Sequence, residues 1–246
     1  PSAICTALLS SRPMRPNGLA LEPEGTFLLA DLGAEAGGLF RLHADGRVDP
    51  VLAEWEGRPF PPTNYVHRVP DGALYITVST RRHPRDLGYR PDVDDGFIVL
   101  LREGKAEIVA DGLGYTNECV LSPEGDALFV NETFTRRLSR FPVRADGRLG
   151  PKEVVATFGP GIYPDGLTLD AEGGICITSI VSNAVIRIAP DGRQETWLED
   201  SDPDHVAWTE AAYREGRLGR VHLDKAAGRR LANISSLAFG GPGLRT

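Results

Sequence analysis

The sequence predicts an all-β protein, a β-propeller whose four-stranded antiparallel blades surround a central channel. One pattern of polar residue, strand, turn and strand recurs four times. Its polar residue, here called the leader, falls at Asn17, Asn64, Asn117 and Asp165, at spacings of 47, 53 and 48 residues. One four-stranded blade per roughly 40–50 residues is typical of a propeller. A β-sandwich also consists of short strands, but it gives no reason for one pattern to recur.

The repeated segments predict the individual strands. Strong copies occupy residues 16–33, 62–79, 115–133 and 163–180, and a weaker copy, ISSLAFGGPGLRT, occupies 234–246. Each strong copy predicts a strand of about five residues, a turn of the Pro-Glu-Gly type and a second strand. A third strand is expected in GLFRLHADG, RLSRFPVRADG and AVIRIAPDG, because each run ends in Asp-Gly, another hairpin turn.

Residues 1–246 are expected to form one propeller domain with two insertions, at about 79–95 and 201–231. Helical periodicity is scarce, and only VAWTEAAYREGRLG at 206–219 favours a helix. The chain begins with Pro1, so a processed, trimmed or partial product is expected.

Composition limits the partners and the compartment. The net charge is −7 and no basic block is present, so nucleic acid is not an expected partner. No apolar run approaches the roughly 18 residues of a membrane helix, and no secretory signal is visible. Cys5, Cys119 and Cys176 have no close spacing, which fits neither a disulfide framework nor a thiolate zinc site. A cytoplasmic protein is therefore predicted, with no prediction of its oligomeric state.

Propeller geometry gives the leaders a shared position. Each leader precedes the innermost strand of its blade, so the four should meet at one mouth of the channel. Carboxamide and carboxylate oxygens that converge in this way suit a hard divalent cation. The alternative is that Asn and Asp cap turns before strands, as they do in many folds.

The sequence resembles the senescence-marker/gluconolactonase/luciferin-regenerating-enzyme family of six-bladed propellers. The resemblance is carried by PNGLALEPEG, TNECVLSPEGDALFVNETFTRRLSRF, YPDGLTLDAEGG and NISSLAFGGPGLRT, and it covers nearly the whole chain. It implies one divalent ion on the propeller axis, calcium or zinc, with magnesium or manganese as alternatives. It also implies that Asn117 and Asp165 are metal ligands and that Asn64 belongs to a pair that contacts substrate.

The sequence departs from the family pattern at three places. Tyr65 stands where an acid usually follows the asparagine, and Glu118 stands where a glycine usually follows Asn117. The first-blade glutamate ligand of the family would lie upstream of Pro1. Six blades of about 45 residues need roughly 270 residues or more, so a chain that is short at both ends is expected.

The leading hypothesis is a metal-dependent lactonase that opens a cyclic ester with an activated water, with a small lactone or ester as its partner. Asp165 is the predicted catalytic residue and, with Asn117, a metal ligand. The predicted substrate contacts are Asn64, Asn17, Tyr65 and Glu118, together with His83 and Arg81 from STRRHPRDLGYRP at 79–91. In that loop Arg82 and Arg85 are further candidates for selecting an anion. The alternatives are a non-catalytic propeller that binds a small molecule or protein, and a metal-dependent phosphotriesterase or esterase.

Overall fold

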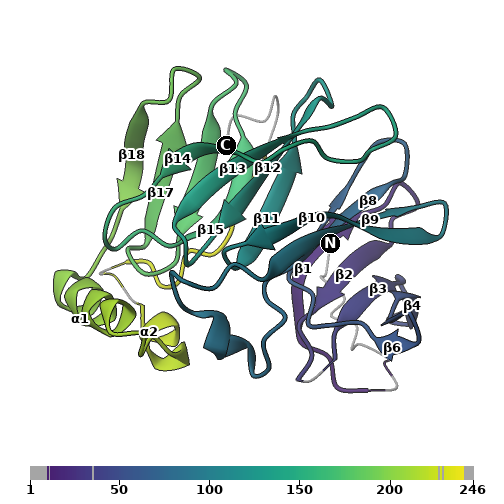
Figure 1. Ribbon diagram of the computed structural model, residues 1–246, viewed down its shortest axis with the longest axis horizontal. Helices are drawn as coiled ribbons and strands as arrows, with labels where there is room; N and C mark the ends of the chain where they lie inside the picture. The colour runs from purple at the N-terminus through teal and green to yellow at the C-terminus, as the bar shows by residue number, and fades with distance from the viewer. Residues whose placement is uncertain (1–9, 11, 35, 227, 229, 241–246) are drawn as a thin grey trace.

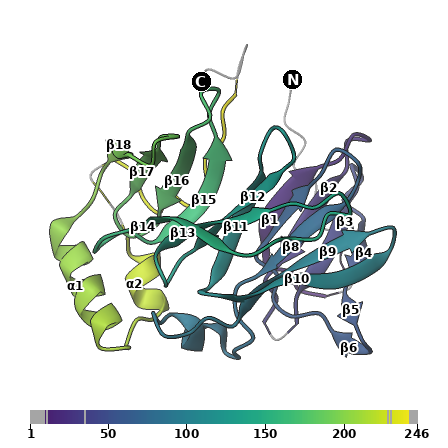
Figure 2. The same ribbon diagram turned by 45° about the horizontal axis from the view of Figure 1, so that its top comes forward.

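The computed structural model describes residues 10, 12–34, 36–226, 228 and 230–240. Within these ranges the chain forms four four-stranded antiparallel sheets, each a meander of consecutive strands. Figures 1 and 2 show the sheets side by side in chain order, from the purple first sheet to the green fourth. The predicted all-β, propeller-like arrangement of four-stranded antiparallel blades is therefore confirmed, with four sheets in the described part.

The first two sheets follow the first two copies of the repeat. The strands of the first sheet are β1 (Pro16–Leu21), β2 (Phe27–Asp31), β3 (Gly38–Leu42) and β4 (Val48–Leu52). A small hairpin comes next, consisting of β5 (Glu54–Trp55) and β6 (Arg58–Pro59). The strands of the second sheet are β7 (Tyr65–Arg68), β8 (Leu74–Val78), β9 (Gly96–Arg102) and β10 (Lys105–Leu113).

The third and fourth sheets follow the next two copies. The strands of the third sheet are β11 (Thr116–Leu121), β12 (Ala127–Glu132), β13 (Arg137–Pro142) and β14 (Glu153–Thr157). The strands of the fourth sheet are β15 (Pro164–Leu169), β16 (Ile175–Ser179), β17 (Ala184–Ile188) and β18 (Gln194–Glu199). The first strand of every sheet is its innermost one, and the predicted third strands are β3, β13 and β17.

The predicted turns close the hairpins. Between β11 and β12, Gly125 has a φ of 75°, a value that favours glycine because it has no Cβ. Its N–H donates to the carbonyl oxygen of Ser122 at 2.9 Å. Of the weaker fifth copy, residues 241–246 lie outside the described residues, as does Cys5. Cys119 and Cys176 are buried and free.

The predicted helix exists, with different ends. α1 spans Pro203–Arg214, three residues before the predicted start, because Asp202 caps it by accepting the N–H groups of Asp204 and His205. It ends before Gly216, whose φ is 66°. A second helix, α2 (Arg220–Asp224), and a 3₁₀ turn, η1 (Arg85–Gly88), lie at the same end of the sheets (Figures 1 and 2). No helix in the described ranges is long and apolar enough to cross a membrane.

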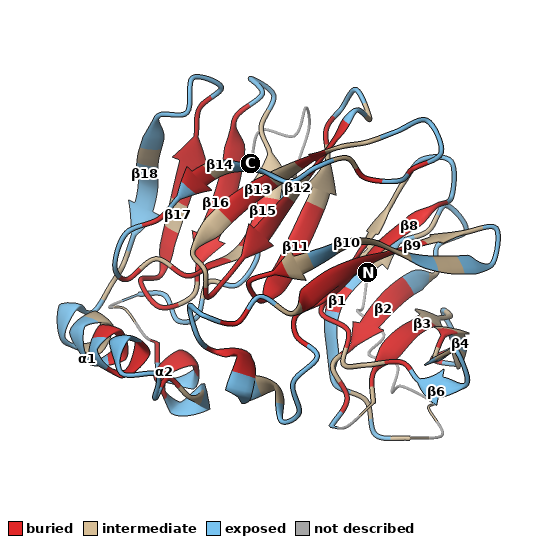
Figure 3. Cartoon of the chain, viewed as in Figure 1, coloured by how far each residue is buried: buried red, intermediate tan, exposed pale blue. Residues whose placement is uncertain are grey.

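The hydrophobic core lies between successive sheets rather than inside one of them. Along β8, Ile76 packs in a cluster with the first sheet, whereas Tyr75 packs in a cluster with the third. A third cluster joins the third and fourth sheets. The inner faces are therefore buried on both sides of the middle sheets, as the red strands of Figure 3 show.

A buried aromatic group lies between the helices and the end of the sheets at which the innermost strands begin. It includes Tyr89, Tyr115, Phe134, Tyr163 and Tyr213. The Tyr213 hydroxyl donates to the carbonyl oxygen of Phe134 at 2.5 Å, and Arg136 pairs with Glu210. These contacts fix α1 against the third and fourth sheets.

We expect Leu128→Ala to lower the free energy of unfolding by about 2–5 kcal/mol, because Leu128 is 0% exposed between the second and third sheets. Leu87→Ala is the control. Leu87 is 51% exposed, so its loss should change stability by less than about 0.5 kcal/mol. Urea unfolding checks both, and equal effects would contradict a core placed between the sheets.

Candidate functional site

The innermost strands of all four sheets line one pocket of about 560 Å³. Three of the four leaders contribute to it, namely Asn17, Asn117 and Asp165. The pocket therefore occupies the central channel, at the end where these strands begin. The predicted meeting of leaders holds for these three.

A β-bulge lies at each of these three leaders. The register between β11 and β12 shifts between Thr116 and Cys119, so Asn117 and Glu118 together oppose one residue of β12. The same shift occurs at Asn17 in β1 and at Asp165 in β15. Because a bulge re-aims a side chain and bends its strand, it turns each leader out of the regular alternation and toward the channel.

Asp165 has an unusual proton affinity. Burial raises the pKa of this carboxyl group from its ordinary 3.8 to about 7. A hydrogen bond from Asn117, and then the positive charges of Arg85 and Arg220, oppose that rise without cancelling it. Asn117 is held in turn, since its Nδ2 donates to Thr133 Oγ1 at 3.0 Å. The carboxyl group can therefore exchange a proton near neutral pH.

Glu118 is a second carboxyl group of the same kind. Burial raises its pKa to about 7, and the charge of Asp165 adds to the rise. Its Oε2 accepts the N–H of Leu167 on β15 at 3.0 Å, and Ser236 also donates to the carboxylate. Glu118 thus links β11 of the third sheet to β15 of the fourth sheet. An ionised Asp165 therefore makes Glu118 harder to ionise.

Asn64 differs from the other leaders. It is buried, and its side chain is not among the pocket-lining groups. Its Nδ2 donates to Ser79 Oγ at 2.9 Å, while Asn17 Nδ2 donates to the Asn64 carbonyl oxygen at 2.9 Å. Asn64 therefore supports Asn17 from behind, and its predicted contact with substrate remains a prediction.

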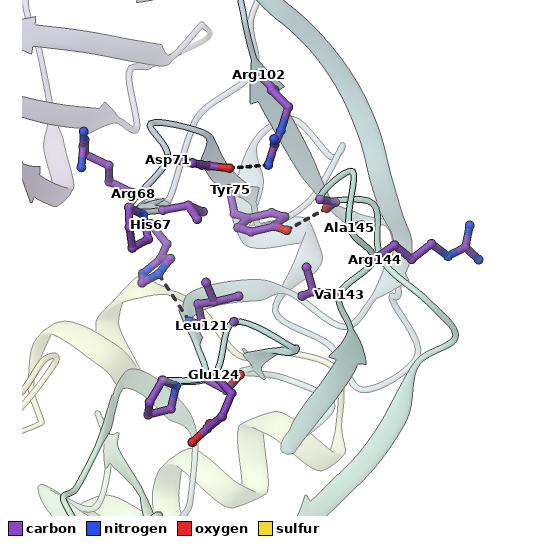
Figure 4. Close-up of a pocket in the computed structure, with 16 residues that line it drawn as sticks. His67, Arg68, Asp71, Tyr75, Arg102, Leu121, Glu124, Val143, Arg144 and Ala145 are labelled. Atoms are coloured by element: carbon purple, nitrogen blue, oxygen red, sulfur yellow. Dashed lines mark hydrogen bonds and ion pairs between the residues drawn. The ribbon is translucent and has the colours of Figure 1, made fainter.

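Tyr65 and His67 form another part of the lining. Burial raises the pKa of the Tyr65 phenol, with a contribution from the charge of Glu118. Burial lowers the pKa of His67 to about 4, so the imidazole is neutral at pH 7. His67 also lines a second pocket of about 590 Å³ at the opposite end of the inner strands, where Asp71 pairs with Arg102 (Figure 4).

The fifth copy of the repeat completes the lining. Ser235, Ser236 and Leu237 lie in the pocket, and the Ser235 carbonyl oxygen accepts the hydroxyl of Thr178 on β16 at 3.1 Å. In sequence, Ser235-Ser236-Leu237 aligns with Asp165-Gly166-Leu167 of the fourth copy. That alignment is the sequence signal that could have identified both serines as pocket residues.

The loop candidates lie elsewhere. Arg81 pairs with Asp111 at 2.7 Å and is exposed, and His83 is exposed as well. Neither lines the channel pocket. The loop residue whose charge acts on Asp165 is Arg85, together with Arg220 of α2. The sequence named Arg85 as one of three candidates and gave no sign of Arg220.

The oxygen donors of the pocket fit a hard cation. Asp165 and Glu118 supply carboxylates, and Asn117 and Asn17 supply carboxamides. Glu118 is buried and Asp165 is half-buried, and the charge of Asp165 raises the proton affinity of Glu118. A divalent cation bound beside them would stabilise both carboxylates as anions. In the described ranges no group of three or more His, Cys, Asp or Glu is placed for a metal, so any set of protein ligands here includes amide oxygens.

Comparison with known proteins adds a family match. Residues 9–199 match the model described as the SMP-30/gluconolactonase/LRE-like region. The chain is 28% identical over 198 residues to the 6-deoxy-6-sulfogluconolactonase of Pseudomonas putida, a match that covers 76% of this chain and 62% of that protein.

Two solved structures have the same fold. A gluconolactonase of Xanthomonas campestris superposes with a TM-score of 0.61 at 23% identity, covering 75% of this chain and 62% of that one. A luciferin-regenerating enzyme superposes with a TM-score of 0.60 at 15% identity, covering 96% of this chain and 69% of that one.

The raised pKa of Asp165 predicts a pH-dependent stability difference. Between the unfolded pKa near 3.8 and the folded pKa of about 7, the folded state keeps a proton that the unfolded state releases. Stability from this group is therefore fully present below pH 3.8 and falls as pH rises to 7. The free energy of unfolding of Asp165→Asn, minus that of the parent, should therefore be on the order of 1–2 kcal/mol larger at pH 8 than at pH 4.

Urea unfolding of both proteins with EDTA, at the two pH values, measures this difference. Glu24→Gln is the control, because Glu24 is an exposed turn residue outside the pocket. A gain that is the same at both pH values would show that Asp165 does not hold its proton in the folded state.

Proposed function

The chain belongs to the SMP-30/gluconolactonase/LRE-like family, and on that premise we propose that it is a metal-dependent hydrolase that opens a lactone. The observation that carries the proposal is the pair Asp165 and Glu118, two carboxyl groups with pKa values of about 7 in one pocket. General acid–base catalysis is most efficient with such values near the working pH. The chain spans 62% of the length of the Pseudomonas putida relative, whose name denotes a lactonase for a sulfonated sugar acid.

In this proposal Asp165 and Asn117 hold a divalent ion. An all-oxygen donor set favours calcium or magnesium over zinc, which prefers nitrogen and sulfur ligands. When bound, the ion would act as a Lewis acid on the lactone carbonyl. Asn17, supported by Asn64, would orient the substrate against the channel wall.

Glu118 then accepts the proton. Water attacks the acyl carbon of the lactone and gives a proton to the Glu118 carboxylate. The bond between the acyl carbon and the ring oxygen breaks, and the ring oxygen takes up that proton. The product is a hydroxy acid, and Glu118 returns to its starting state. Tyr65 stands where an acid usually follows the asparagine, and Asp165 would be occupied as a metal ligand. Among the pocket-lining residues, this leaves the Glu118 carboxyl group to accept the proton.

We also propose six blades for the whole protein and a cytoplasmic location. The fifth copy lies beside the fourth sheet, where Ser235 contacts β16, which is the position at which a next blade would begin. The free, buried thiols of Cys119 and Cys176 are in keeping with a reducing compartment.

A propeller that binds a small molecule without turnover is the second candidate. The observation that favours it is the phenol of Tyr65 in the channel, at the position where the family carries an acid. A metal-dependent phosphotriesterase or esterase would use the same groups on another substrate. Turnover of a lactone, of a phosphotriester or other ester, or of neither separates these candidates.

We expect Asp165→Asn and Glu118→Gln each to lower kcat/KM for glucono-δ-lactone by about 100-fold or more, the usual contribution of a positioned acid–base group. Activity should also rise with pH through about 7 as the pair loses its protons. Initial rates in a pH-stat, above spontaneous hydrolysis, measure both, with Glu24→Gln as the control. Full activity in either variant would remove that residue from the mechanism.

Metal binding should be visible as stability. Calcium at about 100 times its dissociation constant should add about 2.7 kcal/mol to the parent after treatment with EDTA. Asp165→Ala should abolish the gain, because it removes a ligand, while Glu24→Gln should keep it. Thermal melts with calcium, magnesium, zinc or manganese test this, and a gain that survives in Asp165→Ala would place the ion elsewhere.

A further inference from the structure

A third, smaller pocket of about 350 Å³ has a basic lining. Arg15, Arg85 and Arg220 contribute to it, and the exposed Asp86 is its one carboxylate among the described residues. Its lining comes from four separate parts of the chain: the segment before β1, residues 32–34 after β2, the loop that contains η1, and α2. Arg15 precedes the leader Asn17 by two residues, so the pocket adjoins the channel mouth.

Arg85 is the least neutralised arginine of its loop. Its Nε and Nη2 both donate to the neutral Tyr115 hydroxyl, at 2.9 and 2.6 Å, and no carboxylate in the described part of the chain pairs with it. The neighbouring arginines differ. Arg82 pairs with Asp95 at 3.3 Å and Arg90 with Asp92 at 2.7 Å. The tyrosine fixes the guanidinium group of Arg85 without neutralising its charge.

Arg220 adds a second positive charge at the same place. It pairs with Asp224 on its own helix and hydrogen-bonds to Tyr89, which also lines the pocket. Burial lowers the pKa of Arg85, but its interactions with Tyr115 and Tyr89 outweigh burial and raise the pKa overall. The nearby charge of Arg220 acts against that rise, because the two cations repel each other. Like charges held together in a partly buried pocket are unfavourable unless an anion joins them.

The pocket lies within electrostatic reach of the proposed catalytic group. The charges of Arg85 and Arg220 both favour the ionised form of Asp165. No direct salt bridge joins either arginine to Asp165 among the described ion pairs, so the donors of Arg85 are not used up by that carboxylate. An anionic group in this pocket would lie beside the channel rather than inside it.

We propose that the lactone substrate carries an anionic substituent, a carboxylate, sulfonate or phosphate, and that Arg85 and Arg220 bind it while the ring enters the channel. The proposal rests on the lactonase function proposed above. A fixed arginine suits all three anions, because its planar donors match their paired oxygens.

Rates with four matched lactones test the proposal: glucono-δ-lactone and its analogues with a 6-carboxylate, 6-sulfonate or 6-phosphate. The parent should prefer at least one anionic lactone by about tenfold or more in kcat/KM, the effect of one hydrogen bond to a charged group. Arg85→Gln should remove that preference. Loss of its charge near Asp165 affects every lactone alike, so kcat/KM for the anionic lactone should fall about tenfold further than kcat/KM for the neutral one. Arg90→Gln, the matched loop control, should keep the preference.

The anion that shows the largest preference identifies the substituent. No preference in the parent, or an equal loss for neutral and anionic lactones in Arg85→Gln, would overturn the proposal. Arg220→Gln provides a second variant if Arg85→Gln does not fold, since Arg220 is exposed and its partner Asp224 remains in solvent.

A binding measurement separates this proposal from the lactonase function. Calorimetric titration with inorganic phosphate and sulfate at low salt should show binding in the parent that is weaker by about tenfold in Arg85→Gln. If no lactone is hydrolysed and this binding persists, the lactonase function fails and the anion site stands. If lactones are hydrolysed but no Arg85-dependent binding or preference exists, the anion site fails alone.

Discussion

Burial of both faces of each inner sheet is the constraint on which the rest of the structure depends. Because Ile76 and Tyr75 pack to opposite sides of the second sheet, neighbouring sheets must stand face to face. Their innermost strands are then forced together around the channel. This closeness places Asp165 and Glu118 where water is scarce, and it raises the pKa values of both carboxyl groups. The chemistry of the pocket thus follows from the packing of the blades.

The residue after each leader decides how the inner strands differ. A Cβ on Gly18 would lie 2.5 Å from the Tyr65 ring, and one on Gly166 would lie 2.6 Å from Ser236 Cα. Glycine at these positions lets the next inner strand approach. Tyr65 and Glu118 hold the same position in the other two copies, and their side chains enter the pocket instead. A repeated backbone therefore yields an asymmetric site from one variable position per blade.

The sequence predicted the strands, the hairpin turns and the leaders because each depends on neighbouring residues. The Pro-Glu-Gly pattern predicts the turn at Gly125, and the repeat spacing is enough to align Asn17, Asn117 and Asp165. It did not predict that Asn64 turns toward Ser79, because the bond joins two segments fifteen residues apart. Nor did it predict the contact between Glu118 and Leu167, or Arg220 beside Arg85. These depend on how separate sheets and a helix pack, which no local pattern encodes.

The proposed reacting groups and the proposed anion-binding groups stand on different kinds of structure. Asn117, Glu118 and Asp165 belong to strands locked between sheets, whereas Arg85 and Arg220 belong to a loop and a short helix outside the sheets. Such segments tolerate insertion and exchange far better than a packed strand does. Selectivity can therefore change through evolution, or by loop grafting, while the reacting centre stays intact. Proteins with this fold can therefore acquire new substrates while the reacting residues in the inner strands stay the same.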